Sequence, residues 1–412
     1  MTHDPVEYIR GLQQLLISDK KKLGFLFGAG TSSAKKNENS ITIPNIMEMT
    51  EQIKVALCLN GTYKGAIEEI EQELKNDKFT IETLLSNIEQ KSQFIGKGVL
   101  NGLKREQFIK LALEIKRQVK EMVNIHKGVN TDSSVHVDFA EWIGRANKKH
   151  AVELFTTNYD YFFELGLENK NIPYYDGFTG SYQPFFDASS VEDMFFSPNQ
   201  TKLWKMHGSL GWNYDRQNKK IIRKDIDTGD LLIYPSILKY DESRKQPYMA
   251  LVDRLANFLK QPDTILITCG YSFGDEHINE RILTALKSNS LSHVLALYYD
   301  KSLTEESTVC KIAKSESKIS VYSQRRAVIG SQFGTWKLKR EPPDDDDAIP
   351  IELYFDTDAP NNPETELRKE FKGTETWTGE GELILPDFQC FVTFLQSMMF
   401  PSKPVSIEGQ KK

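Results

Sequence analysis

The chain has 412 residues, of which 39% are hydrophobic, so it can bury one large core or the cores of two domains. A formal net charge of −6 disfavours a general or sequence-specific nucleic-acid binder, because such proteins usually carry a basic face. The 4 cysteines lie far apart, which excludes a cysteine-rich zinc site and a disulfide framework. No apolar run has the length of a membrane span and the first residues lack a signal-peptide pattern, so we expect a cytoplasmic protein without a membrane partner.

A helix and a buried strand are the first predicted elements. Asp4 is a suitable N-cap, and Pro5 a suitable first residue, for a helix that continues to Ile17. The apolar run from Leu23 to Phe27 then predicts a strand that is buried in a parallel sheet.

Small residues follow this strand at once, namely Gly28, Ala29, Gly30, Thr31 and Ser32. Glycine has no Cβ to clash with a pyrophosphate and can adopt φ > 0, so this turn lets backbone N–H groups approach a bound anion. Ser33 stands where a full dinucleotide fingerprint has its third glycine. A tight structural turn is therefore the alternative reading of the motif.

Residues 46–150 have a different character, with helical periodicity and dense charge, most clearly in segments 67–74, 81–89 and 108–123. We expect a large helical insertion between the first strand and the next, which serves as a lid or as an assembly surface, with assembly preferred. The scattered histidines of this region, His126, His136 and His150, are expected at the surface or in helix caps.

Three further predicted strands, about residues 151–155, 203–206 and 264–268, end in glycine or polar residues. Those residues are Thr157, Asn158, Asp160, His207, Gly208, Gly270 and Ser272. Predicted helices at 247–259 and 277–286 alternate with strands at 294–299 and 319–322, and segments 221–222 and 231–234 suggest a hairpin. The alternation predicts an α/β fold with a Rossmann-like, doubly wound and mainly parallel sheet.

A small C-terminal extension, residues 336–412, follows this pattern. Its acidic run at 344–347 predicts a solvated loop, and 351–355 predicts a strand. The apolar segment 386–399 predicts a helix that packs on the main domain or on another subunit. We expect the extension to be an assembly or partner surface.

The strand ends are expected to meet, because ligands of open parallel sheets bind beyond the carboxyl ends of the strands. In this order, the motifs also resemble those of sirtuins, and most closely those of bacterial sirtuin-like proteins of anti-phage defence. The motifs are Gly28-Ala-Gly-Thr-Ser32, Ile43-Pro44, Thr157-Asn158-Tyr-Asp160, Lys205-Met-His207-Gly208 and Gly270-Tyr-Ser272. The resemblance covers roughly residues 20–335 and implies an NAD-binding domain at 1–335, with Pro44 and the glycine, threonine and serine residues of these motifs among its NAD contacts.

Two departures from the sirtuin pattern matter. The chain lacks the four-cysteine zinc ribbon, and Asn45 stands where sirtuins usually have an aspartate after Ile-Pro. Loss of the ribbon argues against protein deacylation but leaves dinucleotide cleavage open. The defence relatives are NAD⁺ glycohydrolases that deplete NAD⁺ in abortive infection, so the resemblance implies NAD⁺ as substrate and no zinc. It also implies a homo-oligomer and a HerA-type ATPase as a partner.

Cleavage of the nicotinamide–ribose bond passes through an oxocarbenium-like state and needs no strong acid, since the leaving nitrogen is already cationic. Asn158 can hold ribose hydroxyls or a water, or else form a plain Asx-turn. Asp160, by the sirtuin pattern, receives the nicotinamide amide and can stabilise the cation, or else it only caps a helix. His207 suits a general base, or else it is a turn histidine.

Two acidic residues near predicted strand ends also have purely structural interpretations. Asp300 ends a strand where dinucleotide folds often contact a ribose, but a turn acid is an equal alternative. Asp275 is expected to cap the helix that starts at His277. Two other functions remain open for the whole chain: an NAD-dependent deacylase or ADP-ribosyltransferase, and a non-catalytic NAD or ADP-ribose sensor.

Overall fold

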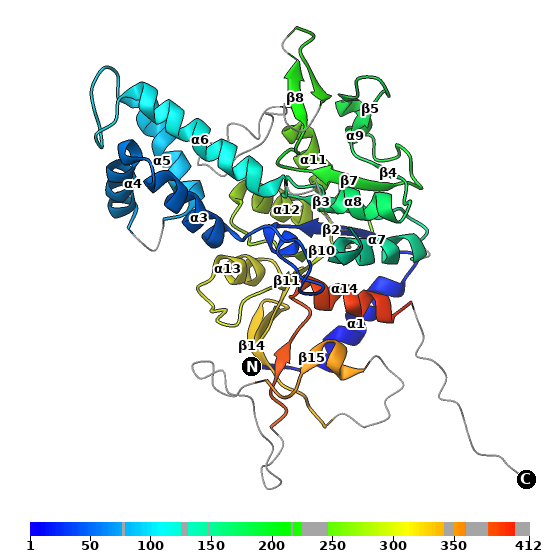
Figure 1. Cartoon of the computed structure of the whole chain (residues 1–412). Helices are drawn as coiled ribbons and strands as arrows, with labels where there is room; N and C mark the ends of the chain where they lie inside the picture. Colours follow the sequence, from blue (N-terminus) through cyan, green and yellow to red (C-terminus); the bar gives the residue numbers. More distant parts are fainter. Residues whose placement is uncertain are drawn as a thin grey trace, which may run out of the picture.

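A ten-stranded sheet forms the centre of the molecule in the computed structural model, which describes residues 1–75, 79–124, 131–146, 148–215, 217–224, 246–341, 350–359 and 378–399 (Figure 1). The strand order is β1-β14-β13-β12-β11-β10-β2-β3-β7-β4. The strands span β1 (Thr2–His3), β2 (Lys22–Phe27), β3 (Glu153–Thr156), β4 (Tyr174–Tyr175), β7 (Thr201–Lys205), β10 (Thr264–Cys269), β11 (His293–Tyr298), β12 (Ile319–Ser323), β13 (Arg326–Ile329) and β14 (Gln332–Trp336).

Every neighbouring pair from β12 across to β4 is parallel, whereas β13 pairs antiparallel with both β12 and β14. From β2, the chain first adds β3 and β7 on one side and later adds β10, β11 and β12 on the other. This doubly wound arrangement confirms the predicted Rossmann-like α/β fold. It also places the topological switch point between β2 and β10, where such sheets bind ligands.

Helices cover both faces of the sheet. On one face lie α1 (Pro5–Ile17), α7 (Val135–Arg145), α8 (Phe162–Asn169) and α14 (Phe388–Ser397); on the other lie α11 (Tyr248–Leu259), α12 (Glu276–Ser288) and α13 (Thr308–Ser315). Strand β2 shows why both are needed: Phe25 and Phe27 enter the first core, and Leu26 enters the second. A strand with two apolar faces is stable only between two helical layers.

The helical insertion has a hydrophobic core of its own. Its helices are α3 (Ile46–Cys58), α4 (Gly61–Leu74), α5 (Ile81–Phe94) and α6 (Arg105–Val123), and they project from one side of the sheet (Figure 1). Ile53, Ile67, Leu85 and Ile115 are fully buried among them. The next helix, α7, packs on the sheet instead, so the insertion with a separate core ends at about residue 123.

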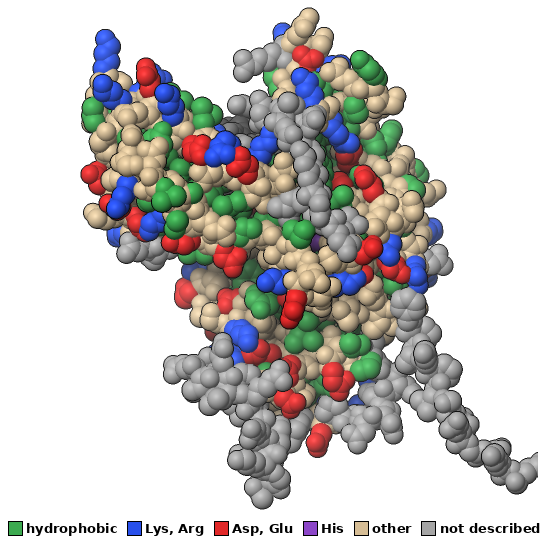
Figure 2. Space-filling view, in the orientation of Figure 1, with side chains coloured by type: hydrophobic (Ala, Val, Ile, Leu, Met, Phe, Trp, Pro, Cys, Tyr) green, Lys and Arg blue, Asp and Glu red, His purple; other side chains and the backbone are tan. Residues whose placement is uncertain are grey.

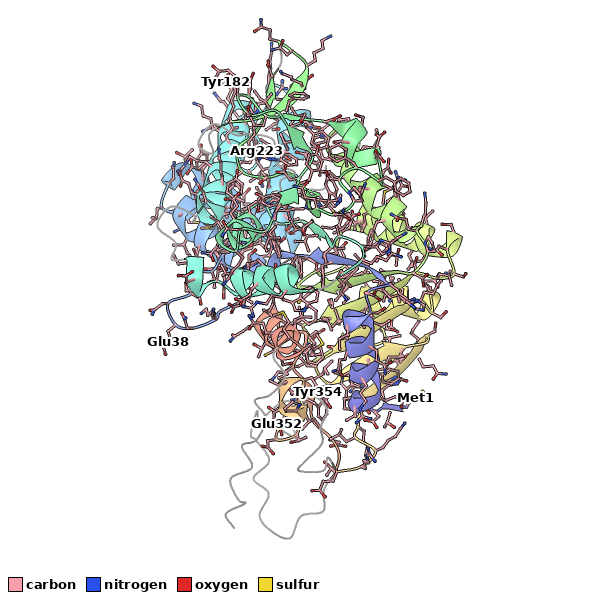
Figure 3. The ribbon with its side chains drawn as sticks, turned by 90° about the vertical axis from the view of Figure 1, so that its right-hand side faces the viewer. Met1, Glu38, Tyr182, Arg223, Glu352 and Tyr354 are labelled. Carbon is pink, nitrogen blue, oxygen red and sulfur yellow. The ribbon has the colours of Figure 1, made fainter. Side chains whose placement is uncertain are left out.

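A small antiparallel sheet lies at the end of the molecule where Tyr182 and Arg223 are found (Figure 3). Its order is β5-β6-β9-β8, with β5 (Phe178–Thr179), β6 (Phe185–Phe186), β8 (Trp212–Asp215) and β9 (Lys220–Arg223); a short helix, α9 (Ala188–Glu192), follows β6. The segment 221–222 pairs with β8. The segment 231–234, which we expected as its hairpin partner, lies outside the described residues, as does the acidic run at 344–347.

The C-terminal extension lies at the opposite end of the molecule, where Glu352 and Tyr354 are found (Figure 3). The predicted strand at 351–355 is wrong for most of its length: Ile351–Leu353 form a 3₁₀ turn, and only Phe355 begins a strand, β15 (Phe355–Asp356), which pairs with β16 (Glu382–Leu383). The apolar helix α14 packs on the main domain, with Phe388 5.4 Å from the ring of Phe27. Its apolar face is therefore part of the first core.

A buried ion pair joins the second helical layer to the sheet. Arg254 of α11 donates to both carboxylate oxygens of Glu153, at 2.9 and 2.7 Å, and the indole N–H of Trp204 donates to the same carboxylate at 2.8 Å. Two further bonds from Arg254 reach the carbonyls of Val191 and Asp193. This network fixes β3 and β7, the two strands that lead to the predicted site. In the described part of the chain, no helix has both the length and the apolar character to cross a membrane.

Candidate active site

One cavity of about 450 Å³ lies beyond the carboxyl ends of β2, β3, β7 and β10, and the insertion forms part of its wall. Predicted site residues that line it are Gly28, Ala29, Gly30, Ser32, Pro44, Thr157, Asn158, Asp160, His207, Gly270 and Ser272. Residues of the insertion that line it include Asn45, Ile46, Met49, Thr80, Glu82, Val119 and Val123. The sheet thus supplies a mostly polar wall and the insertion a mostly apolar one.

Three predicted site residues do not line this cavity. Thr31 is buried beneath the glycine turn, where its hydroxyl donates to the Gly28 carbonyl at 2.9 Å. Gly208 has φ of +87° and donates its N–H to the Lys205 carbonyl, so it forms the turn after β7. Asp300 accepts hydrogen bonds from the N–H and hydroxyl of Ser302, which makes it a turn acid at the end of β11.

The glycines of the turn have a different physical role from the one expected. Gly28 has φ of −118°, so it needs no left-handed conformation. A Cβ on Gly28 would lie 2.4 Å from the carbonyl oxygen of Gly270, and one on Gly30 would lie 2.7 Å from the Gly270 Cα. The N–H of Gly30 donates to that same Gly270 carbonyl at 3.1 Å, so it is not available to an anion. These glycines allow the loops after β2 and β10 to pack backbone against backbone.

Asn158, Ser32 and Asp160 form one buried network at the floor of the cavity. The Asn158 side-chain amide donates to the Gly28 carbonyl at 3.1 Å and to the Ser32 hydroxyl at 2.8 Å. The Ser32 hydroxyl donates to one carboxylate oxygen of Asp160 at 2.7 Å. The other oxygen of Asp160 accepts the N–H of Phe162 at 3.0 Å, at the start of α8. Asp160 precedes Tyr161, the N-cap of α8, and its carboxylate orders this turn while it also lines the cavity.

His207 pairs with an acid that the sequence reading assigned only to a helix cap. Its Nε2 lies 3.1 Å from Oδ2 of Asp275, while Oδ1 of Asp275 accepts the N–H of Ile278 as the N-cap of α12. Both side chains line the cavity. One signal in the sequence could have found the pair: Asp275 follows Ser272 in a loop that the topology brings to the same sheet edge as His207.

A second buried ion pair supports the loop that carries Asn158 and Asp160. Lys205 of β7 donates to the backbone carbonyl of Asp160 and lies 3.1 Å from the carboxylate of Glu164 on α8. Burial raises the pKa of Glu164, and the ammonium of Lys205 opposes this shift. The Lys205 side chain of the neighbouring strand β7 therefore stabilises the loop that carries Asn158 and Asp160.

The prediction that His136 lies at the surface or in a cap is wrong. Its side chain is buried between aromatic rings, stacked on Phe162 at 5.0 Å and edge-on to Phe163 at 4.6 Å. Burial lowers the pKa of His136 to about 4, so it stays neutral in the folded protein. Its Nδ1 lies 3.2 Å from the Ser134 hydroxyl, and its Nε2 has no hydrogen-bond partner among the described residues. His150 is half-exposed, and His126 lies outside the described residues.

Asn45 belongs to the wall that the insertion provides. Its side chain accepts the N–H groups of Met47 and Glu48, both at 3.0 Å, and Glu48 accepts the Asn45 N–H, which forms a capping box at the start of α3. An asparagine at this position therefore serves to begin the insertion. The turn before it places Pro44 and Ile43 on the cavity wall.

The charged side chains among the described residues that line the cavity are Glu82, Asp160 and Asp275, all acidic. A ligand anion at this site has no lysine or arginine among these residues to pair with and must be bound by neutral donors, whereas a ligand cation is favoured by the local field. Within the described ranges, no group of three or more histidine, cysteine, aspartate or glutamate side chains is arranged to hold a metal ion.

Residues 152–321 match the family model of the SIR2-like domain. The match begins just before β3 and ends in β12, so it contains Asn158, Asp160, His207 and Gly270 and leaves out the glycine turn and the insertion. No curated protein matches the chain. The chain is Sir2-like over this range, which supports an NAD-related function and NAD⁺ as a ligand.

Proposed function

We propose that this chain, which is SIR2-like over residues 152–321, is an NAD⁺ glycohydrolase that cleaves NAD⁺ to nicotinamide and ADP-ribose. One observation carries the proposal: Asn158, Asp160 and His207, which follow two different strands, line a single cavity with the turn after β2. The cavity lies at the switch point of the sheet, where dinucleotides bind in doubly wound folds.

The reaction suits an acidic cavity. The bond that breaks joins the ribose C1′ to the pyridinium nitrogen, and its electron pair moves to that nitrogen to leave neutral nicotinamide. Positive charge then develops on the ribose ring, as in glycoside hydrolysis. The carboxylates of Glu82 and Asp160 stabilise this charge relative to solvent in a partly enclosed site. The apolar wall from Ile46, Met49 and Val119 shields the nicotinamide ring from water.

Each polar side chain has a role that its contacts permit. The Asn158 amide nitrogen is held by the Gly28 carbonyl and Ser32, which leaves its amide oxygen for a ribose hydroxyl or a water. Asp160 faces the nicotinamide amide. His207, paired with Asp275 through Nε2, uses Nδ1 as the base that removes a proton from water while the water oxygen bonds to C1′.

The experiment is to incubate purified protein with NAD⁺ and to quantify nicotinamide and ADP-ribose by chromatography, with and without the product of any neighbouring gene. We expect His207→Ala and Asn158→Ala each to lower turnover by about 10²–10⁴-fold while the unfolding midpoint is retained. His293→Ala is the matched control, because His293 lies at the exposed start of β11, away from the cavity.

Three outcomes would contradict the proposal. Normal hydrolysis by both site variants would remove the assigned roles. NAD⁺ binding without breakdown would favour a sensor. Labelled protein or O-acetyl-ADP-ribose among the products would favour an ADP-ribosyltransferase or a deacylase.

The motif resemblance extends the proposal to an NAD-depleting effector of bacterial anti-phage defence, assembled as a homo-oligomer with a HerA-type ATPase as partner. An unrestrained NADase would kill its host, so regulation through a partner surface is expected. The insertion is the candidate for that surface, because α14 buries its apolar face within the chain, whereas Val55 of α3, Leu59 directly after α3 and Leu113 of α6 are exposed. Figure 2 shows apolar side chains among charged ones on the surface of the insertion. Mass measurement of the native assembly tests the homo-oligomer, and a map of the operon tests whether a gene for a HerA-type ATPase lies beside this one.

A further inference from the structure

We propose that Asp275 is a positioning residue for His207, which sets the tautomer of the imidazole and so makes Nδ1 the reactive nitrogen. The inference rests on the proposed function, since it concerns the base of that reaction. It goes beyond the sequence reading, in which Asp275 only caps a helix.

The two carboxylate oxygens of Asp275 contact different partners among the described residues. Its Oδ1 accepts the N–H of Ile278 at 3.1 Å and thereby caps α12, and its Oδ2 lies 3.1 Å from His207 Nε2. A residue that served only as a cap would use one oxygen, whereas the second oxygen of Asp275 contacts a histidine from the turn after β7. The side chains of His207 and Asp275 are 10% and 13% exposed, so their contact is largely shielded from solvent.

The loop after β10 holds Asp275 in place. The Tyr271 hydroxyl donates to Oδ1 of Asn279 at 3.0 Å, and the Asn279 amide donates to the Phe273 carbonyl at 2.8 Å. These bonds connect the start and the middle of the loop to the first turn of α12. The carboxylate is therefore fixed before any ligand arrives, as an orienting group must be.

The chemistry of this contact determines which nitrogen of His207 carries the hydrogen. An ionised carboxylate only accepts hydrogen bonds, so the hydrogen in this contact belongs to Nε2 of the neutral imidazole. Nδ1 then carries the free electron pair, and it has no hydrogen-bond partner within the described part of the chain. When Nδ1 takes the proton, the carboxylate stabilises the imidazolium that results. The other titratable side chains that line the cavity are Glu82, Tyr159, Asp160 and Tyr271, and the Tyr159 ring lies 6.4 Å from that of His207.

Asp275→Asn tests the inference without removal of the helix cap, because asparagine caps helices as well as aspartate does. Its amide can present either an oxygen or an NH₂ group to Nε2, so it no longer fixes the tautomer. The matched control is Asp387→Asn, since Asp387 caps α14 with the same geometry, through the Cys390 N–H at 3.0 Å, and lies outside the cavity lining.

We expect Asp275→Asn to lower kcat for NAD⁺ hydrolysis by at least about 10-fold, within the 10²–10⁴-fold that a general base contributes, with little change in KM. Asp387→Asn should leave kcat unchanged. Equal kcat values for the two variants would overturn the inference.

A second measurement separates this inference from the proposed reaction. The ¹⁵N shifts of the His207 imidazole report its tautomer, whether or not the protein hydrolyses NAD⁺. We expect the Nε2–H form in the wild-type protein and a mixture in Asp275→Asn. An inactive wild-type protein with the Nε2–H form would refute the NADase and leave the pair intact, whereas an Nδ1–H form in the wild type would refute the positioning role.

Discussion

Gly270 is the residue at which the packing of the site can be tested most sharply. It has φ of +66°, and a Cβ added there would lie 2.6 Å from the Thr31 nitrogen and 2.9 Å from the backbone of Gly30. Gly330 has a similar φ of +56°, but no atom lies within 4 Å of a Cβ placed on it. Substitution by alanine therefore has the same conformational cost at both glycines, but only at Gly270 does the added Cβ clash with backbone atoms.

The left-handed conformation costs an alanine about 1–2 kcal/mol relative to glycine, and this applies to both positions. Overpacking against backbone atoms that cannot move aside adds about 1–3 kcal/mol, and this applies only to Gly270. We expect Gly330→Ala to lower the free energy of unfolding by about 1–2 kcal/mol and Gly270→Ala by about 2–5 kcal/mol.

Urea unfolding at a fixed pH measures both values, and titration calorimetry with NAD⁺ on the folded variants measures the effect on the site. Gly270→Ala should also weaken NAD⁺ binding, because the loop after β2 must move to admit the Cβ, whereas Gly330→Ala should not. Equal destabilisation by the two variants, or unchanged NAD⁺ binding by Gly270→Ala, would refute the view that these glycines exist for close packing of two loops.

Three other predictions follow from buried or wall-forming side chains. The pKa of His136 is about 4 in the folded protein against 6.5 when unfolded, so the stability that it contributes is complete above pH 6.5 and falls by about 3 kcal/mol towards pH 4. Urea unfolding of His136→Leu should therefore show a smaller loss of stability between pH 6.5 and pH 4 than the wild type. An equal loss in both proteins would exclude a buried, neutral His136. Glu153→Gln leaves Arg254 as a buried charge without its carboxylate and should cost about 3–5 kcal/mol in the same assay, with a cost below 1 kcal/mol as the contrary result. Ile46→Trp should fill the cavity and raise the Kd for NAD⁺, whereas Val55→Trp, on the exposed side of the same helix, should leave the Kd unchanged. Equal Kd values for the two variants would show that the insertion does not form a wall of the NAD⁺ site.

Much of the fold follows from local patterns. The apolar runs at 23–27 and 264–268 predict strands of the central sheet, and Asp4 with Pro5 predicts the start of α1; each of these is found. The gathering of strand ends also follows, because topology alone brings the loops after parallel strands to one edge. The strand predicted at residues 351–355 is wrong for most of its length, because a segment this short has no periodicity that distinguishes a strand from a turn.

The contacts that give each site residue its environment could not be predicted, because they join residues distant in the sequence. Asp275 reads as a helix cap from its neighbours, and only the fold shows that its second oxygen meets His207. His136 lies near the start of a helix and is expected from the sequence in a cap or at the surface, yet aromatic rings of α8 and α14 bury it. Gly28 reads as a phosphate-turn glycine, although the close partner that demands it is Gly270, far along the chain.

The central claim is that the loops after β2, β3 and β7 bind one NAD⁺ molecule in one cavity. A crystal structure of the His207→Ala variant with NAD⁺ tests it most directly, because this substitution should slow cleavage and leave binding in place. We expect intact NAD⁺ in the cavity, with its nicotinamide beside Asp160 and its ribose beside Asn158. NAD⁺ bound elsewhere on the molecule, with this cavity empty, would contradict the account.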